Sequence, residues 1–226
     1  MSAISRWRRR FRGPFRSDTP DNSAPALDRE LRDEIRRSFD AASSDDEHFP
    51  STIDPRIQHV QVLLKFFGPL DDKEVLDAGC GKGRFARVLA EHNPGARVTG
   101  LDLSEAMLRF TPAGINKVAG SMNELPFADS AFDAIYATES LEHAVDIEGA
   151  VAGLCRVLKP GGKLAIIDKN ADHWGKLGTP KWERWFGQNE LEKLLRRHCH
   201  SVRSEFLSYW ADVEPDGLFI AWYARK

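Results

Sequence analysis

Residues 75–85 read VLDAGCGKGRF, a short apolar run followed by three glycines at alternate positions. The apolar run predicts a buried strand. Gly79, Gly81 and Gly83 would let the chain turn sharply beneath a ligand without obstruction by side chains. The dinucleotide-binding fingerprint requires a further glycine where this chain has Arg84. The stretch therefore predicts a ligand-binding loop at the carboxyl end of a strand, without the signature of pyrophosphate binding.

Further along the chain, short apolar segments alternate with segments of helical periodicity. Such alternation is typical of parallel strands joined by right-handed helical crossovers, which build a doubly wound sheet. Ser104 is a suitable N-cap for the helix that follows the second strand. Strands are expected at residues 74–78, 97–102, 118–119, 134–137 and 163–168, with helices at residues 85–91, from residue 104, and at residues 147–158.

The C-terminal part of the chain departs from this alternation. After a helix at residues 189–198, apolar segments at residues 202–208 and 218–223 are joined by a connection too short for a helical crossover. Consecutive strands joined in this way are expected to be antiparallel. The sequence therefore predicts an α/β fold: a doubly wound, seven-stranded, mostly parallel, Rossmann-like sheet that ends in an antiparallel hairpin.

Two helical segments precede the first strand. One carries an apolar stripe with a four-residue repeat, formed by Leu27, Leu31, Ile35 and Phe39. The other covers residues 56–67 and is stopped by Gly68 and Pro69. With 226 residues, 42% of them hydrophobic, the chain has enough apolar side chain for one core. We expect one domain at residues 26–226, in which residues 26–70 form cap helices.

Residues 1–25 are expected to form a basic, flexible tail and linker. The first 17 residues hold six arginines and no acidic residue, interleaved with Trp7, Phe11 and Phe15. This composition also fits peripheral contact with an anionic membrane or a mitochondrial transit peptide. Because these six arginines contribute positive charge to an overall net charge of −2, the rest of the chain carries a net negative charge. An acidic body argues against a nucleic-acid partner and favours a small-molecule ligand.

Asp102 ends the second predicted strand, where its carboxylate could accept hydrogen bonds from both hydroxyls of a ribose. Alone, an aspartate at a strand end is a weak signal. Together with the acidic residue Asp77 and the glycine loop, it becomes a strong one. A carboxylate beside the loop suits a ligand with ammonium and sulfonium charges better than one with two phosphates.

Four stretches with this order and spacing resemble class I S-adenosylmethionine (AdoMet)-dependent methyltransferases of the type 11 group, which includes quinone C-methyltransferases. The resemblance covers residues 56–226. It implies AdoMet as cofactor, S-adenosylhomocysteine (SAH) as product, and the seven-stranded sheet with its closing hairpin. The stretches are VLDAGCGKGRF, GLDLSEAML, GSMNELPFADSAFDAIYATESLEH and LCRVLKPGGKLAIID.

The resemblance implies a residue-by-residue cofactor site. Asp77 and the glycine loop, with Cys80, would hold the methionyl end, and Asp102 the ribose. Leu103 would flank the adenine, with Ser121 and Met122 at its edge. Family members often carry aspartate where this chain has Ser121, and an uncharged hydroxyl should bind the adenine amino group more weakly. The predicted cofactor residues are Asp77, Gly79, Cys80, Gly81, Gly83, Asp102, Leu103, Ser121 and Met122.

Methyl transfer mainly requires alignment of acceptor, methyl group and sulfur, and a base only where the acceptor must lose a proton. His143 and Glu139 follow the fourth strand and are the candidate catalytic residues. His143 has a pKa range suited to a base, and its alternative role is packing or capping. Glu139 could instead serve the cofactor or the acceptor. We predict no metal site, because no ligand set has suitable spacing.

Residues 171–188 hold four large aromatic side chains, Trp174, Trp182, Trp185 and Phe186. They either line an apolar acceptor site or pack in the core. We expect a methyltransferase acting on a small, lipid-like or aromatic acceptor. The alternatives are a nicotinamide-dependent oxidoreductase and a catalytically degenerate AdoMet-binding scaffold. Three widely spaced cysteines suggest reduced thiols and a cytoplasmic protein, with peripheral membrane contact through the tail.

Overall fold

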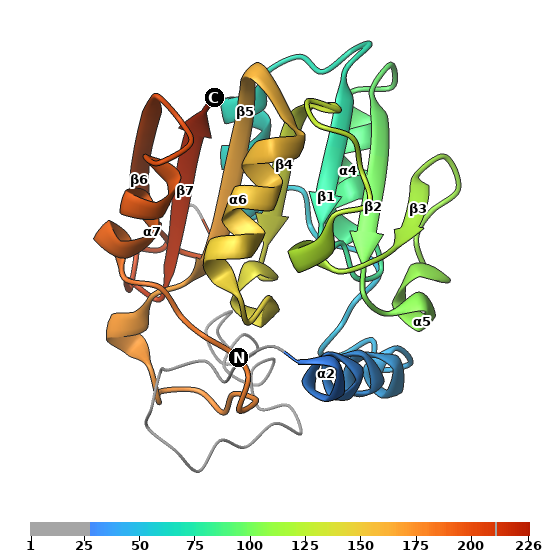
Figure 1. The fold of residues 1–226 in the computed structure, drawn as a ribbon, viewed down its shortest axis with the longest axis vertical. Helices are drawn as coiled ribbons and strands as arrows, with labels where there is room; N and C mark the ends of the chain where they lie inside the picture. The colour runs from blue at the N-terminus through green and yellow to red at the C-terminus, as the bar shows by residue number, and fades with distance from the viewer. Residues whose placement is uncertain (1–27, 211) are drawn as a thin grey trace.

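The fold is known from a computed structural model, which describes residues 28–210 and 212–226. The predicted basic tail therefore lies outside the described residues. Seven strands form one sheet in the order β3-β2-β1-β4-β5-β7-β6. Helices cover both of its faces (Figure 1). The strands are β1 (Glu74–Ala78), β2 (Arg97–Asp102), β3 (Asn116–Ala119), β4 (Phe132–Thr138), β5 (Leu158–Lys169), β6 (Ser201–Leu207) and β7 (Phe219–Arg225).

The helices occupy the positions that the alternating pattern predicts, with small differences at their ends. Ser104 is the N-cap of α5, as predicted, and its side chain accepts from the Met107 N–H. The α-helices are α2 (Arg29–Ala42), α3 (Gln58–Phe67), α4 (Arg84–His92), α5 (Glu105–Leu108), α6 (Ile147–Val157) and α7 (Gln188–Leu195). Short 3₁₀ helices are η1 (Met122–Glu124), η2 (Leu141–His143) and η3 (Ala171–His173).

The strand pairing confirms the predicted doubly wound sheet. Strands β3, β2, β1, β4 and β5 are parallel, whereas β7 is antiparallel to both β5 and β6. The fifth strand is longer than its apolar run predicts. It begins at Leu158, which pairs with Phe132 before a shift in register. Pro160, Gly161 and Gly162, which lie between the predicted helix and the predicted strand, belong to this irregular part of β5.

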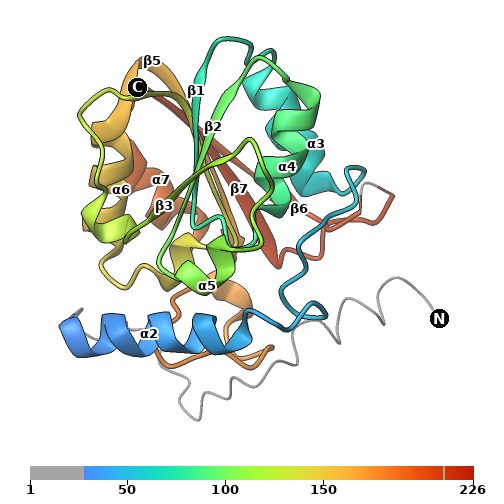
Figure 2. The same ribbon diagram turned by 90° about the vertical axis from the view of Figure 1, so that its right-hand side faces the viewer.

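Each face of the sheet has its own apolar core, because both faces are covered by helices. Ile135 of β4 and Ile166 of β5 pack on the face covered by α6 and α7. Their neighbours Tyr136 and Ile167 pack on the face covered by α3 and α4. All four side chains are fully buried. Figure 2 shows the two helical layers with the sheet seen edge-on between them.

Helix α2 lies apart from these layers, across the edge where the parallel strands end (Figure 2). Its N-cap Asp28 accepts from the Leu31 N–H at 2.8 Å. Its apolar stripe, as predicted, faces inward: Leu31 and Ile35 join Val145 and Trp182 in a small separate cluster. The helix thus covers the edge at which ligands bind in open α/β sheets.

Two findings bear on the surroundings of the protein. Within the described residues, no helix combines the length and the apolar character needed to cross a membrane. All three cysteines have free, buried thiols, and the Sγ atoms of Cys155 and Cys199 lie 3.8 Å apart.

Candidate active site

A cavity lies at the carboxyl edge of the sheet, between the strand ends and α2. Residues 48–50 after α2 and residues 177–180 after β5 close its sides. Asp77 and Gly83 are the sequence-predicted residues outside its lining. The other predicted residues that line it are Gly79, Cys80, Gly81, Asp102, Leu103, Ser121, Met122, Glu139 and His143.

The three loop glycines all have positive φ, but they are required for different reasons. A Cβ on Gly79 would lie 2.5 Å from the Cβ of Ser140, and one on Gly83 would lie 2.8 Å from Thr111 Cγ2. These two glycines therefore permit close packing within the protein. A Cβ on Gly81 would meet no atom within 4 Å. Since Gly81 also lines the cavity, it leaves space for a ligand.

Asp102 ties the glycine loop to the next helix. Its Oδ2 accepts from the Gly81 N–H at 2.7 Å, and its Oδ1 accepts from the Ser104 N–H at 2.8 Å. Burial raises the pKa of Asp102 to about 6, although the backbone hydrogen bonds oppose that shift. At neutral pH the carboxylate is therefore ionised, and it lies in the wall of the cavity.

Asp77 lies beneath the glycine loop, buried and outside the cavity lining. The hydroxyl of Tyr136 faces it, without a hydrogen bond of ordinary geometry. Burial raises the pKa of Asp77 to about 8. At neutral pH this carboxyl is therefore mostly protonated. Its position suits support of the loop from below better than direct contact with a ligand.

The residues predicted at the adenine end share one wall of the cavity. Leu103 follows β2, and Ser121 and Met122 follow β3. Ser121 Oγ accepts from the Asn123 N–H at 3.2 Å and so caps η1. A hydroxyl oxygen has two lone pairs, so one acceptor position stays available for a ligand. In the adjoining loop, burial raises the pKa of Cys80 well above its usual value, which makes this thiol an unreactive lining group.

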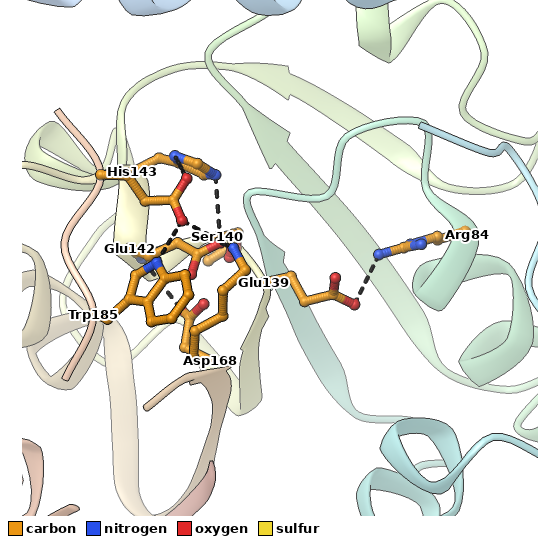
Figure 3. Close-up of polar contacts among 10 residues, drawn as sticks. Arg84, Glu139, Ser140, Glu142, His143, Asp168 and Trp185 are labelled. Atoms are coloured by element: carbon orange, nitrogen blue, oxygen red, sulfur yellow. Dashed lines mark hydrogen bonds and ion pairs between the residues drawn. The ribbon is translucent and has the colours of Figure 1, made fainter. Parts of the chain in front are cut away.

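Glu139 directly follows β4 and has a backbone φ of 52°. Such a conformation is uncommon for a residue with a side chain and often occurs at functional sites. Its Oε1 accepts from Nη2 of Arg84 at 3.0 Å. The two side chains are only 10% and 15% exposed. Figure 3 shows the Glu139 side chain directed toward Arg84 and away from the polar cluster around His143.

His143 lies in η2, apart from that ion pair (Figure 3). Its buried Nδ1 has no hydrogen bond and lies 3.8 Å from a carboxylate oxygen of Glu183. Its Nε2 lies 3.6 Å from Glu142 Oε1. The ring meets Phe39 of α2 edge-on, with centroids 5.1 Å apart. Burial lowers the pKa of His143 to about 4, so the imidazole is neutral at physiological pH.

Three carboxyl groups and one ammonium are buried together beside His143. Lys169 forms hydrogen bonds with Glu142 and with Glu183, the latter at 3.0 Å. Asp168 accepts from the Glu142 N–H at 3.2 Å, and Glu183 accepts from the Trp185 indole at 2.6 Å. One cation cannot compensate three buried carboxylates. We therefore expect the two carboxyl groups without a cation to favour their protonated forms.

The pKa directions agree with this charge balance. Burial and the neighbouring carboxylates raise the pKa of Glu142, and burial raises that of Asp168 to about 7. Burial opposes ionisation of Glu183 too, but Lys169 lowers its pKa. Burial likewise opposes the charge of Lys169, yet the surrounding carboxylates raise its pKa. The ionised pair is therefore Lys169 and Glu183, while Glu142 holds a proton and Asp168 does so below about pH 7.

Glu142, His143 and Glu183 also place one possible metal-ligand atom each within 4.8 Å of one another. The ammonium group of Lys169 already bonds both carboxylates of this trio. The chain therefore supplies its own cation at this place. The prediction that the protein uses no metal remains a prediction.

The aromatic residues at 171–188 do not line the cavity. Trp182, Trp185 and Phe186 are buried, and Trp174 packs edge-on against Trp185 with centroids 5.4 Å apart. Of the two roles considered for these side chains, core packing is the one observed. The segment contributes Glu183 and residues 177–180 to the cavity instead.

Sequence reasoning did not assign two residues that shape the site. Arg84 directly follows Gly83, and in the sequence it was notable only because the dinucleotide-binding fingerprint has a glycine at that position. Glu183 lies in a segment without helical or strand periodicity. Its side chain reaches the site because the chain returns to the sheet edge after β5, pairing Asn170 with Phe186. No sequence signal identifies such a tertiary contact.

Comparison with known proteins agrees with this geometry. Residues 76–166 match the Methyltransf_11 family, described as a methyltransferase domain. A malonyl-[acyl-carrier protein] O-methyltransferase of Serratia marcescens is 31% identical over 144 residues, which are 60% of this chain and 55% of that protein. The chain spans 31% to 55% of the length of the curated relatives it matches.

Solved structures share the fold at low sequence identity. Phosphoethanolamine N-methyltransferase 2 of Haemonchus contortus, in complex with AdoMet, has a TM-score of 0.70 at 16% identity and covers 85% of this chain and 60% of its own. The [4+2]-cyclase SpnF has a TM-score of 0.71 at 19% identity, over 90% of this chain and 98% of its own. Residues 76–166 are therefore similar to a methyltransferase domain, and the chain shares its fold with these solved structures.

Proposed function

We propose that this protein transfers a methyl group from AdoMet to a small-molecule acceptor. The observation that carries the proposal is the pairing of Asp102 with the glycine loop at one cavity wall. Asp102 is ionised at neutral pH and bonded to Gly81, the loop glycine that faces open space. A carboxylate beside a bare backbone suits a ribose and the short aliphatic chain attached to it.

The residues present suit this cofactor. Asp102 would accept from the ribose hydroxyls, while Leu103, Ser121 and Met122 would enclose the adenine. Asp77, which is protonated at neutral pH, would support the loop from below. When bound, AdoMet supplies a methyl group made electrophilic by its sulfonium. The protein would align the acceptor with that methyl group and exclude water.

We further propose His143 as the general base for acceptors that must lose a proton. Its lowered pKa keeps the imidazole unprotonated, which a base requires. Glu183, 3.8 Å from the buried Nδ1, is placed to favour a proton on that nitrogen. The other ring nitrogen would then be free to accept a proton. Catalytic hydrogen bonds are often longer without substrate than with it.

The acceptor we propose is small and largely apolar, lipid-like or aromatic. Ile35, Phe39 and Phe49 line the cavity on the side of α2. The names of the relatives and structural neighbours span methyl transfer to carbon, oxygen and nitrogen, and one neighbour is named as a cyclase. The acceptor atom is therefore better sought by experiment than by analogy.

We also propose a cytoplasmic location with peripheral membrane contact through residues 1–17. The arginines and aromatic residues of that segment support contact with anionic lipid. Three free thiols are consistent with a reducing compartment. Deleting residues 1–17 should reduce binding to vesicles that contain phosphatidylserine. Equal binding by both proteins would remove the proposed membrane contact.

The proposed activity is tested with AdoMet that carries a deuterated methyl group. The protein is incubated with a small-molecule extract, and products are sought by mass spectrometry. We expect at least one compound to gain a single labelled methyl group. SAH binding without labelled product over a broad acceptor panel would instead favour an AdoMet-binding scaffold.

A further inference from the structure

The ion pair between Arg84 and Glu139 is the starting point. Arg84 is the first residue of α4, directly after the glycine loop, and Glu139 directly follows β4. Both side chains line the cavity. Nη2 of the guanidinium donates to Glu139 Oε1, whereas Nη1 is buried and has no hydrogen-bond partner. Leaving a buried N–H group of a cation without an acceptor costs free energy, so we expect a ligand group to supply an acceptor for Nη1.

The other cationic side chains among the described cavity residues are already engaged. Arg32 makes two hydrogen bonds to Glu124, at 2.8 and 2.9 Å. Lys82 donates to Asp46 at 2.6 Å, and its side chain is only 1% exposed. Lys169 lies between Glu142 and Glu183. Within the described part of the chain, Arg84 is therefore the cavity cation best placed to receive an anionic group.

Glu139 offers the complementary charge beside it. Its backbone conformation is strained, and strain of this kind persists where a side chain must be held in one place. One carboxylate oxygen accepts from Arg84, which leaves lone pairs for a further donor. The pair thus presents a positive and a negative group side by side to the cavity.

We propose that Arg84 and Glu139 together recognise the amino-acid end of AdoMet and SAH, an inference that rests on the proposed function. Nη1 of Arg84 binds the ligand carboxylate, and Glu139 accepts from the ligand ammonium. An α-amino acid carries these opposite charges on adjacent atoms, and this matches the adjacent charges of the ion pair. Glu139 is then a cofactor-binding residue, and His143 alone remains the candidate base.

The proposal predicts a selective defect. The nucleoside 5′-methylthioadenosine has the adenosine and sulfur of SAH but lacks the amino-acid end. Arg84→Gln should weaken SAH binding about tenfold to hundredfold, as expected for loss of one charge-assisted interaction. Binding of 5′-methylthioadenosine should change less than about twofold. Asp102→Ala, by contrast, should weaken both ligands.

Decarboxylated AdoMet separates the two residues, because it keeps the ammonium and lacks the carboxylate. Arg84→Gln should leave its binding nearly unchanged, whereas Glu139→Gln should weaken it. Arg87→Gln is the matched control, since Arg87 is on the same helix but outside the cavity lining. Thermal unfolding of each variant identifies any loss of folding. If Arg84→Gln does not fold, Arg84→Lys keeps the charge and should weaken SAH selectively to a smaller extent.

Titration calorimetry distinguishes the outcomes. Selective loss of SAH binding in Arg84→Gln, with intact binding of 5′-methylthioadenosine, supports the proposal. Equal losses for both ligands, or no loss for either, would overturn it while leaving the proposed function in place. A wild-type protein that binds neither SAH nor 5′-methylthioadenosine would remove the proposed function, and this inference with it.

Discussion

The carboxylate of Asp102 accepts the backbone N–H of Gly81 at 2.7 Å, joining the end of β2 to the glycine loop after β1. The residue expected to bind a ribose therefore also fixes the loop expected to bind the rest of the cofactor. Gly79 N–H reinforces this link by donating to the Leu101 carbonyl at 2.8 Å. Such a site is organised before a ligand arrives, and this lowers the entropic cost of binding.

Replacing Asp102 with alanine should weaken SAH binding by about 1 to 3 kcal/mol, because charged hydrogen bonds are lost. The Gly81 and Ser104 N–H groups also lose their acceptor, so a modest fall in thermal stability is expected as well. Calorimetric titration measures the affinity. An unchanged SAH affinity in a folded variant would remove Asp102 from the cofactor site.

Alanine at Gly83 should mainly reduce stability, whereas alanine at Gly81 should mainly reduce SAH affinity. The Gly83→Ala methyl group would collide with Thr111, so that variant should lose about 1 to 3 kcal/mol of unfolding free energy. The Gly81→Ala methyl group would enter open space at the cavity, costing about 1 kcal/mol of stability. It should still reduce SAH affinity at least about tenfold, since it occupies ligand space. Chemical denaturation and SAH titration on both variants check this; the reverse pattern would contradict the assignment of the loop.

The buried carboxyl of Asp77 should make stability depend on pH. Its pKa is about 8 in the folded protein, against an ordinary value of 3.8. Because the folded state binds this proton more tightly, the resulting stability is fully present below pH 3.8 and is lost as the pH rises to about 8. Asp77→Asn cannot ionise. Between pH 5 and pH 7 it should therefore gain about 3 kcal/mol relative to the wild type in urea unfolding, at about 1.36 kcal/mol per pH unit. If the unfolding free energies of the wild type and Asp77→Asn change in parallel with pH, Asp77 is ionised in the folded protein.

Removing the ammonium of Lys169 should destabilise the protein strongly. Lys169→Met leaves the buried carboxyl groups without their cation, and loss of one partner of such a pair costs about 3 to 5 kcal/mol. The loss should be greater at pH 8 than at pH 6, because carboxyls that can take up protons are less affected. Lys181→Met is the control: its ion pair with Glu34 is exposed, so the expected change is below about 1 kcal/mol. Equal effects of the two substitutions on urea unfolding would contradict the charge balance inferred for the cluster.

His143→Asn should slow methyl transfer about 100-fold to 10,000-fold for an acceptor that must lose a proton. SAH affinity should stay unchanged, because His143 is assigned to the acceptor side. In the wild type, protonation of His143 should abolish the rate only near its pKa of about 4. Steady-state kinetics on the acceptor found by labelling provide the measurement. A full rate in the variant would assign His143 to packing against Phe39.

The positions and directions of the strands could be predicted because they depend on local, periodic features. The alternating apolar segments predicted the parallel strands, and the short connection before β7 predicted its antiparallel direction. Element ends were less predictable: β5 begins five residues before its apolar run, at Leu158, because pairing with Phe132 extends it. That extension depends on a neighbouring strand rather than on the residues themselves.

The acceptor side of the cavity depends on long-range contacts that have no local signature. The aromatic residues after β5 were equally compatible with a pocket and with the core, and packing buries Trp182, Trp185 and Phe186. Glu183 lies near His143 only because the chain returns to the sheet edge. The burial of Asp77 could not be predicted either, because its position in the motif does not reveal that its carboxyl is buried beneath the loop.

The most direct test of the account is calorimetric titration of the purified full chain with SAH, with NADH as the control ligand. The account predicts saturable, single-site binding of SAH that Asp102→Ala weakens, and no binding of NADH. Binding of NADH in place of SAH, or a folded protein that binds neither, would contradict the assignment of this cavity to AdoMet.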